Sequence, residues 1–145
     1  MTFRLTMALA KKDFICELPF CYVLLEDNAY YPWVFLVPKK AHAQNMLDLT
    51  TEERLTLMRE MEIVEKAMDI IYKPTQLNVA MIGNKTPQLH VHIICRFHGD
   101  MYWPGTVWGG HSRPYLSTMK AQTIERIKQE IKKQCQTLQY SFQQD

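Results

Sequence analysis

The feature that most constrains the fold is residues 88–97, QLHVHIICRF, in which apolar and polar side chains alternate. Successive side chains of a β-strand point to opposite faces, so this pattern predicts a strand that is buried on one face. The apolar face holds Leu89, Val91, Ile93, Cys95 and Phe97. The opposite face holds Gln88, His90, His92, Ile94 and Arg96. We therefore expect a strand that displays an amide, two imidazoles and a guanidinium in a row.

Further strands are predicted on both sides of this segment. Residues 20–25 and 33–37 are rich in aromatic and branched side chains and are separated by a short polar connection. A connection this short joins antiparallel neighbours, because a parallel crossover needs about a dozen residues. Residues 77–82 form another expected strand, and residues 14–16 give a weaker signal.

In two segments the spacing of apolar residues is typical of an α-helix. In residues 50–71 apolar side chains recur at steps of three and four, and Thr50 with Glu53 forms a capping box. The methionines of this stripe are expected in the core, because Met fills irregular gaps. Residues 117–138 predict a C-terminal helix. Hairpin strands with segregated helices indicate an α+β fold: an antiparallel meander sheet with a long central helix, in a single domain over residues 1–145.

Composition excludes several classes of function. The chain has 145 residues and a net charge of +2, so no bulk field attracts nucleic acid or an anionic membrane. An anionic substrate must then be recognised by a local site. The sequence has no apolar run of about 18 residues, which favours a cytoplasmic protein without a membrane span. The four cysteines form no C-x-x-C pair, and we expect reduced structural thiols.

The two histidines of the alternating segment allow three interpretations. They are residues of a solvated strand face, ligands of a metal ion, or a nucleophile with its helper. Side chains two positions apart lie about 7 Å from each other on one strand face, which lets both imidazoles address a single phosphoryl group or ion. Catalytic zinc needs a third protein ligand, and no local pattern supplies one. Neutral imidazole can form a covalent intermediate without a separate base.

The loop before the strand offers groups that bind phosphate. Gly83 permits close backbone approach, and the amides of Asn78 and Asn84 offer both donors and acceptors. Gly83 and Asn84 are also typical of simple turn chemistry, which is the interpretation that these two residues favour when taken alone. The sequence by itself leaves both interpretations open.

Several motifs together resemble those of the histidine triad (HIT) superfamily of nucleotide hydrolases and transferases. Residues 86–96, TPQLHVHIICR, are similar to its His-φ-His-φ-His-φ-φ signature, in which φ is apolar. Residues 33–40, WVFLVPKK, and the loop with Asn78, Gly83 and Asn84 are similar to other parts of the family pattern. Gln88 replaces the first histidine of the triad. This glutamine, together with Trp103-Pro104 and Trp108-Gly109, resembles the pattern of a bacterial branch of the superfamily that is similar to diadenosine-tetraphosphate hydrolases.

The resemblance implies a nucleotide hydrolase or nucleotidyl transferase that acts on the α-phosphate of nucleoside phosphates. Dinucleoside polyphosphates such as diadenosine tetraphosphate, or phosphoramidates, are the implied substrates. His90 would be the nucleophile and form a nucleotidyl-histidine intermediate. His92 would contact phosphate oxygens and manage the proton, and Gln88 would donate an N–H to phosphate. The alternative is a non-catalytic nucleotide sensor or interaction module on the same fold, which the loss of the first histidine favours.

The resemblance also implies the binding groups and partners. Asn78, Gly83 and Asn84 would hold phosphate oxygens, and Asp27 would accept the ribose hydroxyls. The chemical step would require no metal or other cofactor, although a divalent metal can accompany the substrate phosphates. Family members usually form homodimers, so a homodimer is expected. The roles of Arg96, His98, His111 and the segment from Trp103 to Trp108 stay open.

Overall fold

The fold is built on a five-stranded antiparallel sheet. The structure is a computed structural model and describes residues 2–142. The strands run in the order β1-β2-β3-β5-β4. Their bounds are β1 (Asp13–Glu17), β2 (Cys21–Leu25), β3 (Trp33–Pro38), β4 (Gln76–Ala80) and β5 (Val91–Arg96). The α+β fold class expected from the sequence is confirmed, including the weakly signalled first strand.

The strand order places β5 inside the sheet. β1, β2 and β3 form a meander, and the chain then crosses over before β4 and β5 form a second hairpin. β5 pairs with β3 on one side, where Phe35 faces His92, and with β4 on the other, where Ala80 faces His92. Because β5 has a neighbour on both sides, its backbone is held by hydrogen-bonded strands where His92 lies.

β5 begins three residues later than predicted. Residues 88–90 precede the strand, because the backbone there has other partners. The N–H of Gln88 donates to the carbonyl of Thr86 in a turn, and the N–H of Leu89 donates to the carbonyl of Ala43. The expected alternation nevertheless continues through the segment, since Leu89, Val91, Ile93 and Cys95 all lie in the same buried core.

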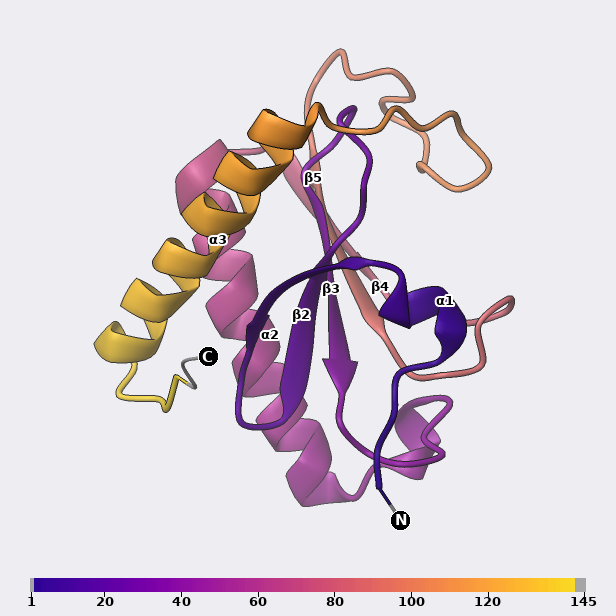
Figure 1. The fold of residues 1–145 in the computed structure, drawn as a ribbon, viewed down its shortest axis with the longest axis vertical. Helices are drawn as coiled ribbons and strands as arrows, with labels where there is room; N and C mark the ends of the chain where they lie inside the picture. Colours follow the sequence, from indigo (N-terminus) through magenta and orange to yellow (C-terminus); the bar gives the residue numbers. More distant parts are fainter. Residues whose placement is uncertain (1, 143–145) are drawn as a thin grey trace.

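Two long helices cover one face of the sheet. α2 (Thr51–Tyr72) and α3 (Ser117–Thr137) lie side by side against it (Figure 1). The predicted capping box is present: the Glu53 N–H donates to Thr50 Oγ1 at 3.1 Å, and the Thr50 N–H donates to Glu53 Oε1 at 2.8 Å. The short helices α1 (Met7–Ala10) and η1 (Met46–Asp48) were not predicted, since each is too short for a periodic signal.

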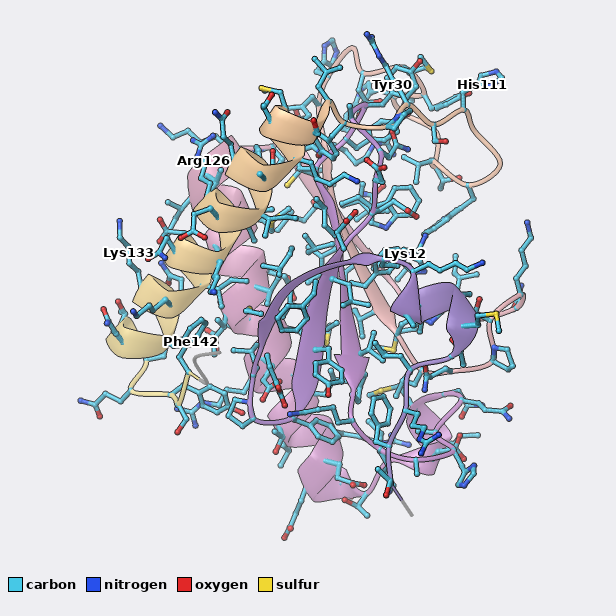
Figure 2. All side chains as sticks on the ribbon, viewed as in Figure 1. Lys12, Tyr30, His111, Arg126, Lys133 and Phe142 are labelled. Atoms are coloured by element: carbon cyan, nitrogen blue, oxygen red, sulfur yellow. The ribbon has the colours of Figure 1, made fainter. Side chains whose placement is uncertain are left out.

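Apolar side chains fill both sides of the sheet. The larger cluster lies between the sheet and the helices α2 and α3. All four cysteines are buried, and within residues 2–142 none forms a disulfide. The smaller cluster lies on the opposite face, where Leu9 of α1 and Val107 pack with Trp33, Phe35 and Ile94. Figure 2 shows side chains occupying the space between the ribbons. No helix within residues 2–142 has the length and apolar content needed to cross a membrane.

Candidate active site

His90 and His92 lie at the floor of a pocket on the face of the sheet opposite α2 and α3. Their exposed fractions are 5% and 6%, and their ring centroids are 4.8 Å apart. The pocket has a volume of about 430 Å³. It is lined by parts of α1, β3, the loop before β5 and the segment around Trp108. The hypothesis of a solvated polar strand face is therefore wrong, because this face is covered.

The ring of His90 is held in one tautomer by the backbone. Its Nδ1 lies 2.6 Å from the carbonyl oxygen of Gln88. A carbonyl oxygen accepts hydrogen bonds and cannot donate, so Nδ1 carries the proton. The lone pair is then on Nε2. This arrangement orients the Nε2 lone pair of His90 at the pocket, as an imidazole nucleophile would require.

The ring of His92 has the opposite tautomer. The indole Nε1–H of Trp33 donates to His92 Nδ1 at 3.1 Å, and an indole N–H can act as a donor only. The proton of His92 is therefore on Nε2, which lies 3.4 Å from the carbonyl oxygen of Ile82. Burial and the neighbouring His90 lower the pKa of His92 to about 4. His92 is thus uncharged at neutral pH.

Aromatic rings and charged groups line the pocket above the histidines. Trp33, Phe35 and Trp108 line it together with the charged side chains, and the Trp108 ring lies edge-on to His92 with centroids 4.6 Å apart. Lys12 pairs with Glu26 at 2.7 Å, and Lys85 is a further cation of the lining. The near-neutral overall charge thus coexists with local cations, which the net charge of the sequence could not reveal.

The loop before β5 brings Gly83 and Asn84 next to the histidines. Asn84 lines the pocket and is exposed. A Cβ atom built on Gly83 would lie 3.1 Å from the Thr86 carbonyl oxygen and 3.8 Å from His90 Cε1. A side chain at this position would crowd the Thr86 carbonyl oxygen, so the absence of one lets the loop turn tightly beside His90.

Asn78 and Asp27, both predicted to bind the substrate, have other partners. Asn78 Oδ1 accepts from Arg96 at 3.0 Å, two positions along β4 from the residue that faces His92. Asp27 Oδ1 accepts from the Tyr115 N–H at 2.8 Å, and its carboxylate pairs with Lys120. Neither side chain lines the histidine pocket.

Glu26 is the acidic residue that the structure places at the pocket, one position before Asp27. The two side chains diverge because β2 ends at Leu25, and consecutive residues at a strand end point to opposite faces. The sequence contained this signal. Glu26 follows the alternation of β2, but the polar run from Glu26 to Asn28 made neighbouring positions look equivalent.

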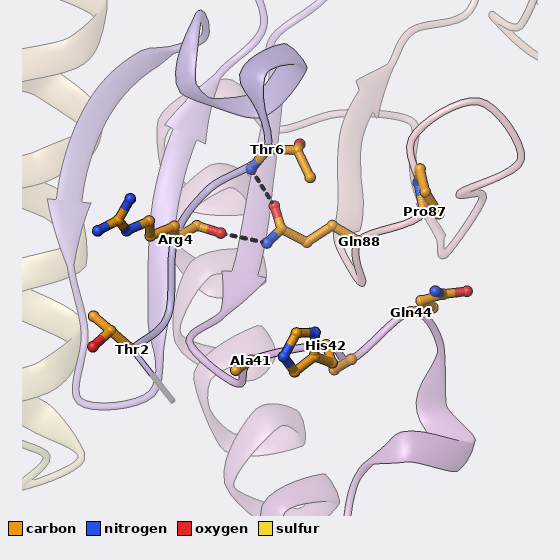
Figure 3. Close-up of a pocket in the computed structure, with 9 residues that line it drawn as sticks. Thr2, Arg4, Thr6, Ala41, His42, Gln44, Pro87 and Gln88 are labelled. Carbon is orange, nitrogen blue, oxygen red and sulfur yellow. Dashed lines mark hydrogen bonds between the residues drawn. The ribbon is translucent and has the colours of Figure 1, made fainter.

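Gln88 also points away from the histidines. Its carboxamide Oε1 accepts from the Thr6 N–H at 2.9 Å, and its Nε2 donates to the Arg4 carbonyl at 2.8 Å (Figure 3). It lines a separate pocket with residues such as His42 and Gln44. The predicted donation from Gln88 to a substrate phosphate has no support, because both ends of the amide bind the amino-terminal segment.

Arg96, whose role the sequence left open, is buried among protein partners. It is 1% exposed, and its guanidinium donates to Asp100, Asn78 and the Gly105 carbonyl oxygen. These bonds tie the segment that precedes Trp108 to β5. Across residues 2–142, no three His, Cys, Asp or Glu side chains are grouped closely enough to hold a metal ion.

In a comparison with protein families, the HIT domain family matches residues 8–99 of the chain. The chain belongs to the HIT domain family. A histidine triad protein from Bradyrhizobium japonicum is 36% identical to this HIT protein, with a TM-score of 0.87 over 90% of this chain and 99% of that chain. A histidine triad protein from Marinobacter aquaeolei is 32% identical, with a TM-score of 0.87 over 92% and 98% of the two chains.

More distant HIT structures share the fold. Diadenosine triphosphate hydrolase from Plasmodium falciparum is 18% identical to this chain, with a TM-score of 0.62 over 85% of this chain and 78% of that one. Among curated protein sequences, none matches the chain. The predicted family and HIT fold are thus confirmed.

Proposed function

We propose that this HIT protein is a nucleotide hydrolase or nucleotidyl transferase of the diadenosine-polyphosphate hydrolase-like branch, with His90 as the nucleophile. The observation that carries the proposal is the bond from His90 Nδ1 to the Gln88 carbonyl oxygen, which leaves the lone pair on Nε2. The pocket is large enough to surround a nucleoside phosphate group in part, at about 430 Å³.

In the proposed reaction the Nε2 lone pair of His90 attacks the α-phosphorus. A nitrogen–phosphorus bond forms, the bridging phosphorus–oxygen bond breaks, and its electron pair departs with the leaving phosphate. Water then attacks the phosphorus, the electron pair returns to Nε2, and the proton of the water is released to solvent. The Gln88 carbonyl stabilises the positive charge that develops on the ring, because it accepts from Nδ1–H.

The remaining pocket residues fit substrate binding. Lys12, Lys85 and the Asn84 amide are positioned to hold phosphate oxygens, and such donors typically contribute a few kcal/mol to transition-state stabilisation. Trp108 offers an aromatic face for a base. We propose Glu26 in place of Asp27 as the acceptor of ribose hydroxyls, because Glu26 lines the pocket. Glu26→Gln should then raise KM for a nucleotide while Asp27→Asn does not.

A dinucleoside polyphosphate is the first substrate to test, since a protein of the same fold carries the name diadenosine triphosphate hydrolase. The protein is mixed with diadenosine tetraphosphate labelled in the α-phosphate and quenched in base, which preserves a phosphoramidate bond. We expect AMP as a product and label on the protein, lost on exposure to acid. Tight AMP binding with neither turnover nor label would overturn the proposal and favour the nucleotide sensor.

The homodimer stays a prediction. β4 lies at an open edge of the sheet, and the side chains of Val79, Met81 and Ile82 are partly exposed there. An open edge with apolar neighbours is a surface that proteins commonly cover. Sedimentation equilibrium of the wild-type chain measures the oligomeric state directly.

A further inference from the structure

Trp33 makes a contact with the histidine pair that the proposed reaction does not yet explain. Its indole N–H is aimed at His92 Nδ1, and the two side chains are both buried. The side chains come from adjacent strands, since Trp33 begins β3 and His92 is the second residue of β5. The hydrogen bond is therefore built into the sheet and does not depend on a mobile loop.

The contact restricts the protonation of His92. An indole nitrogen donates and has no lone pair to accept with. A proton on His92 Nδ1 would point at the Trp33 N–H and would cost the hydrogen bond. Because Nδ1 accepts the Trp33 N–H, the single proton of the neutral ring stays on Nε2. Nε2 lies at the pocket near the Ile82 carbonyl oxygen.

We propose that Trp33 is a positioning residue that fixes His92 as the neutral Nε2–H tautomer, so that His92 serves the proposed reaction as a hydrogen-bond donor and not as an acid. This inference rests on the proposed function only for its kinetic consequence. The tautomer itself is a property of the folded protein.

The cationic side chains around His92 also disfavour a positive charge on its ring. His90 lies beside it, and Lys12 after α1 and Lys85 in the loop before β5 line the same pocket. After burial, electrostatic repulsion from His90 and Lys12 contributes to the lowered pKa of His92. Glu26 is the acidic side chain of the lining, and it is paired with Lys12.

The consequence is a preference among leaving groups. Donation of the Nε2 proton by neutral His92 would leave an imidazolate, which is strongly unfavourable. Gln88 cannot substitute, because its amide is bound to Arg4 and Thr6. A polyphosphate departs as a stable anion without a proton, whereas the nitrogen of a phosphoramidate must be protonated to depart. The site therefore favours dinucleoside polyphosphates over phosphoramidates.

The first test is an NMR measurement that needs no activity. Two-bond ¹H–¹⁵N correlation spectra of the labelled protein report which ring nitrogen of His92 is protonated. We expect an Nε2–H tautomer that does not titrate between about pH 8 and about pH 5, because the pKa of His92 is lowered to about 4. An Nδ1–H tautomer or an imidazolium at neutral pH would overturn the proposal.

Two matched variants separate the hydrogen bond from packing. Trp33→Phe keeps a ring but removes the donor, so His92 should populate both tautomers and its pKa should rise by roughly one unit. Trp108→Phe alters a ring that also contacts His92, and it should leave the tautomer unchanged. A Trp33→Phe protein with wild-type His92 spectra would contradict the assignment.

The second test is kinetic. The ratio of kcat/KM for diadenosine tetraphosphate to kcat/KM for an adenosine phosphoramidate should be high in the wild type. It should fall by about tenfold in Trp33→Phe at mildly acidic pH, where His92 gains a transferable proton. An unchanged ratio would remove the leaving-group preference. A wild type inactive on both substrates would instead contradict the proposed function, and the NMR result would still decide the tautomer.

Discussion

The polar face of the segment from Gln88 to Arg96 has two ends with opposite properties. At one end His90 and His92 line a pocket, and each ring is fixed by one partner that determines its tautomer. At the other end Arg96 is enclosed by Asp100, Asn78 and Gly105. Alternation placed all three side chains on one face. Their neighbours left the histidine end lining a pocket, which is the end proposed to be reactive, and made the Arg96 end structural.

The comparison teaches that a polar strand face can serve two purposes within a few residues. The guanidinium of Arg96 ties down the segment that carries Trp108, which lines the pocket over the histidines. The structural end thus supports the reactive end. Variants at the two ends should therefore fail differently, in activity at one and in stability at the other.

The largest expected effect is on activity at the reactive end. His90→Ala removes the nucleophile, and turnover of diadenosine tetraphosphate should fall by about ten-thousandfold or more. Product chromatography measures the rate, and circular dichroism checks that the fold is retained. His98→Ala changes an exposed histidine outside the pocket and should keep wild-type turnover. Substantial turnover by His90→Ala would remove His90 as the nucleophile.

The next largest effect is on stability at the structural end. Arg96→Met leaves the carboxylate of Asp100, 6% exposed, without its guanidinium, and breaking such a buried pair costs about 3–5 kcal/mol. Urea unfolding measures the loss. Lys66→Met breaks an exposed pair with Glu62 and should cost less than about 1 kcal/mol. Equal losses in the free energy of unfolding would show that the Arg96 cluster stabilises the fold no more than an exposed ion pair does.

A smaller effect is expected where Gln88 binds the amino-terminal segment. Gln88→Ala leaves the Thr6 N–H and the Arg4 carbonyl without their partner, at a cost of about 1–3 kcal/mol. Hydrogen exchange at the Thr6 amide should accelerate, while Gln122→Ala on the exposed surface of α3 should leave it unchanged. Unaltered exchange in Gln88→Ala would mean that other contacts hold this segment.

The smallest effect is a dependence of stability on acid. The Arg96 guanidinium and the Phe97 N–H lower the pKa of Asp100 from 3.8 to about 2. Because the folded state holds the carboxylate charged, the stabilisation is complete above about pH 4 and is lost as the pH falls to about 2. The free energy of unfolding should decline more steeply across this window in the wild type than in Asp100→Asn. Parallel pH profiles would contradict this assignment.

Much of the fold could be predicted because its signals are local. The period of two in residues 88–97 and the capping box at Thr50 each depend on residues close in sequence. The start of β5 depends in addition on the Leu89 N–H, which donates to the carbonyl of Ala43, a residue remote in the sequence. Local patterns therefore predicted which elements form, and distant backbone partners determined where the strand begins.

The site was predictable to a smaller extent, for the same reason. The sequence by itself determined that His90 and His92 share a strand face behind a Gly-Asn loop. Only the tertiary structure decided that the histidines and Glu26 line one pocket, that Gln88 turns to the amino-terminal segment, and that Trp33 donates to His92 Nδ1. Side-chain spacing follows from the backbone repeat of one strand, whereas the protonation and partners of a side chain depend on groups that only folding brings within hydrogen-bond distance.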